Sequence, residues 1–222
     1  MTTLSSLSAK QATRKGIGYS LFDIAEILRR QNRLADARVD AEQSLADRKE
    51  IGNEVEVAES QLQLAEISIQ QEKAIDAESL AGSAIAVFEK HRITNEEAIA
   101  AAVLSEAFVV QGKARDAAVA AQRAVTFANE SQDIGARFES ELANGDVKAV
   151  LQSYQEAQVI LEHVRREASH RGYLGYQLEA DLRLGKVQIK SGNAVAGRIR
   201  LARVRKDAAA RDFSFIARQA AP

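Results

Sequence analysis

Residues 24–45, IAEILRRQNRLADARVDAEQSL, are followed forty positions later by LAEISIQQEKAIDAESLAGSAI at 64–85, and after forty more by LSEAFVVQGKARDAAVAAQRAV at 104–125. The three segments superimpose without a gap. In each of them a small residue, Ala25 in the first copy, is followed seven positions later by a polar turn centred on Asn32, Glu72 or Gly112. A fixed period of this length is typical of repeat architectures, in which each repeat is one supersecondary unit.

The apolar spacing within each copy predicts helices. Ala37, Ala41 and Leu45 fall at positions i, i+4 and i+8, which share one face of a helix, and the pattern recurs forty and eighty residues later. Alanines on that face allow one helix to lie close to its neighbours. A further copy begins at Leu184-Gly185, eighty residues past the third, so the stretch between them must hold one more unit.

The composition favours the same fold class. Of 222 residues, 46% are hydrophobic and only 5% aromatic, so the core consists of Ala, Leu, Ile and Val, and the one proline is Pro222. Alanine is the strongest helix former, and the scarcity of turn residues argues against many short strands. We therefore predict an all-α protein, a right-handed α-solenoid of about five antiparallel helix pairs.

The expected helix pairs are 14–31/34–50, 53–71/74–92, 95–111/114–131, 133–143/146–170 and 173–191/194–210. Gly112, Gly172 and Gly192 stand where helix ends favour a left-handed residue. In the fourth pair we predict the turn at Ala143-Asn144-Gly145-Asp146, which makes the first helix short and the second one long.

The repeat pattern resembles the tetratricopeptide repeat, here through Ala25, Asn32, Ala37, Ala41 and Ser44. It is similar to the longer variants of that repeat rather than to the 34-residue form. The proline that usually ends the second helix is absent, and Lys49 stands near that place. The resemblance covers about 14–211 and implies a protein-binding scaffold that is not an enzyme.

The C-terminal part has a narrower resemblance. Its segments QLEADLRLG at 177–185, SG at 191–192 and FSFIAR at 213–218 resemble the end of repeat arrays attached to bacterial serine/threonine protein kinases. The kinase signatures themselves, a Gly-rich loop, His-Arg-Asp and Asp-Phe-Gly, are absent from the sequence. The resemblance implies a scaffold in bacterial signalling or regulation.

Candidate catalytic and metal-binding residues are few. The chain has no cysteine, which excludes disulfides, thiolate metal sites and a cysteine nucleophile. His163, Glu167 and His170 share one face of a predicted helix, but a di-iron site needs a second Glu-x-x-His, and the sequence has none. We predict an exposed polar face there, and no catalytic residue, metal or cofactor.

The sequence also bears on location. The first fifteen residues hold no apolar run of signal-peptide length, and no stretch of about 18 apolar residues occurs anywhere. We therefore predict a cytoplasmic protein without a membrane span.

The resemblance implies that the first helix of each pair lines a concave surface, with the residue after the small one pointing into it. Those residues are Glu26, Glu66, Glu106 and Lys186, which predicts an acidic ladder that turns basic at the C-terminal end. We expect a partner protein or a peptide with Lys/Arg and apolar anchors to bind there. The predicted binding residues are Tyr19, Phe22, Glu26, Arg29, Arg30, Glu59, Leu62, Glu66, Ile69, Glu106, Val109, Lys186 and Lys190.

A basic C-terminal end offers an alternative. The stretch from Arg183 to Arg218 holds ten Lys or Arg against two Asp, although the net charge of the chain is −1. Binding of nucleic acid or an acidic surface would use Arg198, Arg200, Arg203, Arg205 and Lys206. Against nucleic acid, the last helix of the fifth pair has no interleaved aromatic residues, and a solenoid needs a polar outer face at its end in any case.

The two ends of the chain complete the predicted organisation. We expect an irregular segment at 1–13, the repeat domain at 14–211 and a tail at 212–222. Ile17, Tyr19 and Phe22 have nothing before them to cover an outer face, so we expect self-association or a linked upstream domain at this end.

Overall fold

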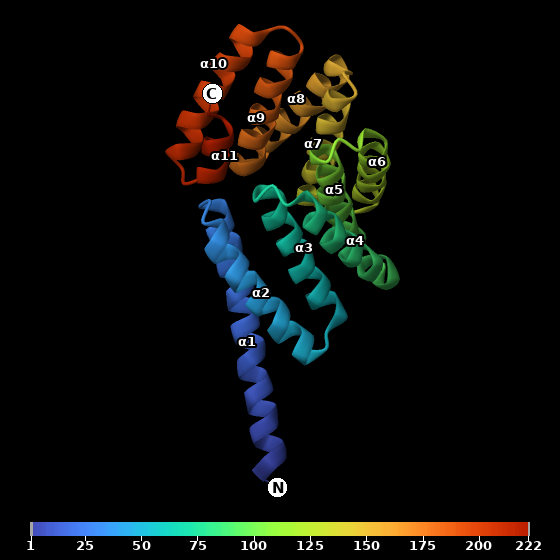
Figure 1. Ribbon diagram of the computed structural model, residues 1–222, viewed down its shortest axis with the longest axis vertical. Helices are drawn as coiled ribbons and strands as arrows, with labels where there is room; N and C mark the ends of the chain where they lie inside the picture. Colours follow the sequence, from blue (N-terminus) through green and yellow to red (C-terminus); the bar gives the residue numbers. More distant parts are fainter. Residues whose placement is uncertain (1, 222) are drawn as a thin grey trace.

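The computed structural model describes residues 2–221, with side chains from 15 to 221, and this part of the chain contains eleven helices and no strand. Ten of the helices form five antiparallel pairs in a curved array (Figure 1). The all-α solenoid prediction is confirmed. The pairs are α1 (Thr2–Arg30) with α2 (Leu34–Ile51), α3 (Glu54–Gln70) with α4 (Ala74–His91), α5 (Thr94–Val110) with α6 (Ala114–Glu130), α7 (Ile134–Val150) with α8 (Tyr154–Arg171), and α9 (Leu174–Lys190) with α10 (Ala194–Ala209).

Both ends of the chain differ from the expectation. Helix α1 begins at Thr2 rather than near 14, so the backbone of 2–13 is helical; Met1 and the side chains of residues 1–14 lie outside the described residues. The C-terminal tail contains a short helix, α11 (Ser214–Gln219), whose Ile216 is buried. The side chain of Ile216 packs in a core cluster with Leu178, Leu182 and Val204 of the fifth pair.

The forty-residue period is strict at the turns within the pairs. Positions 32, 72, 112, 152 and 192 all have positive φ, between 61° and 94°. In each turn the next amide donates to a carbonyl five residues back, as in the 2.9 Å bond from Ser153 to Lys148. This bond closes the helix end. Gly112, Gly172 and Gly192 are left-handed as predicted.

The predicted turn of the fourth pair is wrong. Ala143, Asn144, Gly145 and Asp146 lie inside α7, and the turn is at Leu151-Gln152-Ser153, in step with the other repeats. Gly145 is required for packing rather than for a turn, because a Cβ built on it would lie 2.8 Å from Cγ of Leu161.

The core is built largely from alanine, and each helix packs on its neighbours. Ala25, Ala37, Ala65, Ala77 and Ala117 are among many alanines with no exposed surface. Without bulky side chains the helix axes approach closely, so each pair buries its inner faces against the next pair.

The array curls until its end meets its beginning. Figure 1 shows α11 beside the C-terminal end of α1. The Arg218 guanidinium donates to the backbone carbonyl of Gln70 at the end of α3, at 3.4 Å, across 148 positions of sequence. None of the described helices has the length and apolar character needed to cross a membrane.

Candidate functional site

A groove runs along the inside of the curve, and its lining identifies the inner layer of the solenoid. Its cavity has a volume of about 460 Å³. All of the helical residues that line it come from α1, α3, α5, α7, α9 and α11, and none from the second helices of the five pairs. Six of the residues predicted for partner binding lie here: Arg29, Glu66, Ile69, Glu106, Val109 and Lys186.

The acidic ladder of the groove contains one charged residue more than the sequence pattern predicted. Glu66, Glu106 and Lys186 are joined by Asp146, forty residues from its neighbours on either side. Asp146 was missed because it was assigned to a turn. The forty-residue period identifies it without ambiguity once α7 is continuous.

At the N-terminal end of the groove, Arg29 is shared between two carboxylates. Its Nε lies 2.8 Å from Glu26, and its Nη2 lies 3.7 Å from Glu66. Burial works to lower the pKa of Arg29, but Glu66 and Glu26 outweigh it and hold that pKa above its usual range. Burial raises the pKa of Glu66 to about 7, and Arg29 offsets only part of this effect. The groove therefore holds a carboxyl group that titrates near neutral pH.

Further along, Arg183 binds three carboxylates at once. Its guanidinium nitrogens lie 2.7 Å from Glu106, 2.8 Å from Asp146 and 2.7 Å from Glu179. In the sequence Arg183 belongs to the basic C-terminal stretch, whereas its side chain neutralises the acidic ladder. Arginine suits this position because its planar donors reach several carboxylates from a fixed geometry.

Glu139 on α7 is a half-buried carboxylate that the described part of the groove leaves without a cation, as it does the exposed Glu72. No Lys or Arg of the described residues lies within ion-pair distance of it, and it lines the groove together with Glu66, Glu106 and Glu179. Burial, and then repulsion from those three carboxylates, raises the pKa of Glu139 well above its usual range. Burial, followed by the negative charges of Glu139 and Glu179, raises the pKa of Tyr176 as well.

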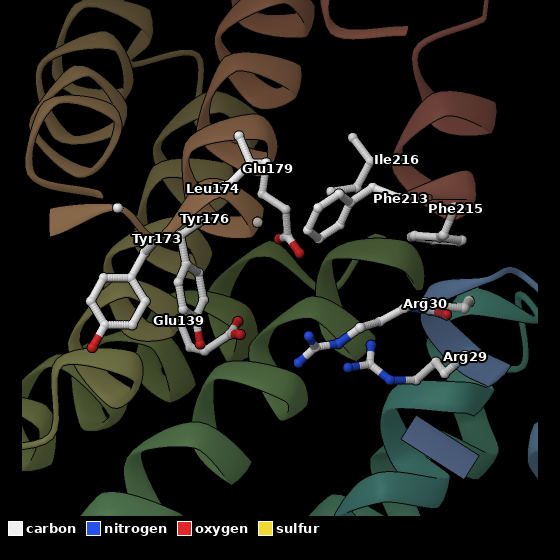
Figure 2. Close-up of a pocket in the computed structure, with 13 residues that line it drawn as sticks. Arg29, Arg30, Glu139, Tyr173, Leu174, Tyr176, Glu179, Phe213, Phe215 and Ile216 are labelled. Atoms are coloured by element: carbon white, nitrogen blue, oxygen red, sulfur yellow. The ribbon is translucent and has the colours of Figure 1, made fainter. Parts of the chain in front are cut away.

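A second cavity, of about 470 Å³, adjoins the groove where the two ends of the array meet (Figure 2). Arg29, Gln70, Glu139 and Glu179 line both spaces, which makes them continuous. The aromatic residues of its wall belong to the C-terminal part of the chain. They are Tyr173, Tyr176, Phe213 and Phe215.

Three residues predicted for the groove surround a buried arginine instead. Arg48, 2% exposed, lies 4.3 Å from the ring centre of Phe22 and 5.3 Å from that of Tyr19, and its Nη1 lies 3.1 Å from Glu59. The hydroxyl of Tyr19 donates to Glu56 at 2.6 Å. This cluster joins α1, α2 and α3, so Tyr19, Phe22 and Glu59 contribute to packing at the first repeat.

The remaining predicted groove residues divide among three environments. Glu26 holds Arg29 and also Arg30, whose Nε lies 2.7 Å away, and Arg30 lines the second cavity. Leu62 is 5% exposed and belongs to the core. Lys190 is exposed at the end of α9, outside the groove lining.

The basic end is less free than its sequence indicated. All five of its predicted residues are on α10, but Arg200 is bound to Asp181 at 2.5 Å and Glu162 at 3.2 Å. Arg198, Arg203, Arg205 and Lys206 are exposed. The described residues contain no cluster of three His, Cys, Asp or Glu arranged for a metal ion, and His163 contacts Glu141 at 2.8 Å.

Solved structures with a similar fold include two Rap proteins and a protein built of TPR-like repeats. A Rap protein complexed with Competence and Sporulation Factor superimposes with a TM-score of 0.77 and 14% identity over 95% of this chain. The chain spans 58% of the length of that Rap protein. The apo form of RapI gives a TM-score of 0.63 and 15% identity over 88% of this chain and 71% of RapI.

A kinesin light chain-like protein of Podosopora anserina, built of nearly identical TPR-like repeats, gives a TM-score of 0.58 and 17% identity over 87% of this chain and 95% of its own. No family model matches the sequence, and no curated protein matches it significantly. At these identities the likeness concerns the fold, which is a helical repeat of the tetratricopeptide type.

Proposed function

We propose that this helical repeat protein of the tetratricopeptide type is a non-catalytic scaffold that holds a peptide, or a segment of a partner protein, in its concave groove. The observation that carries the proposal is the excess of carboxylates in a groove with apolar walls. Six carboxylates face two arginines and one lysine there: Glu66, Glu72, Glu106, Glu139, Asp146 and Glu179. A ligand with basic and apolar side chains would match this surface.

The apolar part of the groove supports the same ligand. Ile69, Ala102, Val103, Val109 and Leu182 line it between the charged rungs. An extended or helical segment would place apolar side chains against these residues and basic ones against the carboxylates. The similar Rap protein was crystallised with a bound factor, which supports a binding role for a solenoid of this shape. A role in signalling or regulation rests on the sequence resemblance alone.

The test is selection of a random peptide library on the purified protein, followed by affinity measurement of the selected peptides. We expect enrichment of Lys and Arg beside apolar residues. Exchanging Glu66→Gln and Glu106→Gln together should weaken binding about tenfold, since each removes a charge-assisted contact. Glutamine is preferable to lysine, because a lysine would face Arg29 or Arg183, which these carboxylates neutralise.

A matched control removes two carboxylates from the outer helices. Glu42→Gln and Glu130→Gln change the net charge equally, at exposed positions on α2 and α6. Binding should survive this control. Equal loss in both double variants would mean that only net charge matters, and unchanged binding in the groove variant would contradict the proposal.

A further inference from the structure

The cavity of Figure 2 has acidic side chains on one wall and basic side chains on the other. Glu139 and Tyr176 lie on one side, while the guanidinium groups of Arg29 and Arg30 extend toward them from the other. A purely cationic ligand would face the two arginines, and a purely anionic one would face Glu139 and Glu179. The charge pattern therefore favours a ligand that carries both signs.

Side chains on each wall still have charged or hydrogen-bonding groups available to a ligand. Glu26 holds Arg30 through Nε, at 2.7 Å, which leaves the terminal nitrogens of this exposed side chain directed into the cavity. On the opposite wall, Glu139 has no cation within ion-pair distance among the described residues. Gln70 adds an acceptor, because its buried Oε1 has no hydrogen-bond partner in the described part of the chain.

The aromatic residues indicate the kind of cation. Phe213 and Phe215 also line the cavity, and Tyr173 and Tyr176 pack on each other with ring centres 6.3 Å apart. Aromatic faces attract ammonium and, more often, guanidinium groups. A guanidinium also carries five donors in one plane, so it can bind a carboxylate through two of them and still donate to a further acceptor.

We propose that this cavity binds a basic side chain, arginine in preference to lysine, together with a carboxylate a few bonds away. The basic group lies against Glu139 and Tyr176, and the carboxylate against Arg30. The inference rests on the proposed function, since it names the part of the bound peptide that enters this cavity. Two sources of the carboxylate share this chemistry: the C-terminus of a peptide that ends in arginine, and an acidic residue next to an arginine.

Short peptides serve as probes. Acetyl-Gly-Arg with a free carboxylate tests the first source, and acetyl-Asp-Arg-amide tests the second. Acetyl-Gly-Arg-amide lacks the carboxylate, and acetyl-Gly-citrulline lacks the positive charge. The protein has no tryptophan, and two of its four tyrosines line the cavity, so tyrosine fluorescence reports binding, with calorimetry as a check.

We expect at least one of the two doubly charged probes to bind about tenfold more tightly than either singly charged one, the factor expected for one charge-assisted contact. Glu139→Gln should abolish the preference for arginine over citrulline and keep the preference for the carboxylate. Arg30→Gln should do the reverse. Glu141→Gln is the matched control, because Glu141 is on the same helix but contacts His163.

The outcomes separate this inference from the proposed function. Equal affinity for all four probes, or no binding of any, would overturn the assignment of this cavity. In that case, selected library peptides whose binding depends on Glu66 and Glu106 would still support the proposed function of the groove. Probe binding without any selected peptide would support the cavity and contradict the scaffold. Melting curves of the variants verify that each remains folded, because an effect on binding that follows unfolding would count against the assignment.

Discussion

The two helices of a repeat pack on each other through different combinations of side-chain size in the first three repeats and in the last two. In repeats one to three, a small residue on the first helix (Ala25, Ala65 or Ser105) corresponds to an alanine sixteen positions later on the second. In repeats four and five the first helix has glycine and the second has leucine. A Cβ on Gly145 would lie 2.8 Å from Leu161, and one on Gly185 would lie 2.8 Å from Leu201.

This difference shows that the contact constrains the sum of two side chains rather than either residue. Cores tolerate exchanges that conserve volume much better than those that add or remove it. The repeat can therefore diverge in sequence while its helices keep their spacing. The predictions below test whether the two solutions are equivalent.

The largest effect is expected from emptying the contact of the fourth repeat. Leu161 is fully buried, so Leu161→Ala should lower the free energy of unfolding by about 2–5 kcal/mol, because Gly145 opposite it cannot fill the cavity. Urea denaturation measures the loss. Leu151→Ala, at a residue 49% exposed, is the control and should change stability by no more than about 0.5 kcal/mol.

Adding side-chain volume to the core of the second repeat should lower the free energy of unfolding by less than Leu161→Ala does. Ala81→Leu introduces the leucine of repeat four opposite Ala65 and should cost about 1–3 kcal/mol. Adding Ala65→Gly should recover part of this loss, with a coupling energy of roughly 0.5–3 kcal/mol in a double-mutant cycle. Ala86→Leu, at an exposed position of the same helix, provides the control. Strictly additive losses would contradict the volume argument.

The ladder position changes along the same axis, from a carboxylate in each of repeats one to four to Lys186 in repeat five, and the pH dependence of stability tests its charge state. Burial raises the pKa of Glu66 to about 7, so the folded protein binds more protons than the unfolded chain between about pH 4.5 and 7. Stability should therefore increase as pH falls through this range, and the melting temperature should rise by roughly 2–4 °C for each kcal/mol gained. Glu66→Gln should flatten the profile; an identical slope would refute the assignment.

The smallest effect is expected at the exposed contact between the two ends of the array. Arg218→Ala removes one long hydrogen bond from an exposed guanidinium and should change stability by about 0.5 kcal/mol or less. Urea denaturation of Arg218→Ala and of Leu161→Ala under the same conditions compares the smallest and the largest expected losses of stability. A loss above about 2 kcal/mol would mean that the ends stabilise the array as strongly as its middle.

The sequence predicted the fold because the first three repeats share their packing residues. It failed in the fourth repeat for two physical reasons. The true turn has Gln152 in a left-handed conformation, without the glycine or asparagine found there in repeats one, three and five. Asn144-Gly145, by contrast, resembles a turn but lies inside a helix. The exchange of volume between Gly145 and Leu161 also removed the alanine pattern on which the alignment depended.

The site was predicted in part, for a related reason. The ladder rungs follow the period, so Glu66, Glu106 and Lys186 were found, and Asp146 would have been found with the correct turn. Glu139 and Glu179 are forty residues apart and lie in the same register as Glu59, which is a usable signal. The role of Arg183 depends on three carboxylates from three helices, an arrangement that needs the curvature of the whole array.

The hydrogen bond between Arg218 and Gln70 joins the last helix of the array to the end of α3. In an open solenoid each repeat interacts with its neighbours alone, and width is set by the sum of small rotations. Here a bond between residues 148 positions apart closes the circumference. The hydrogen bond also adds a contact between residues far apart in the sequence to a chain whose other contacts are mostly local. Such long-range contacts slow folding, because a long loop must be closed before they form.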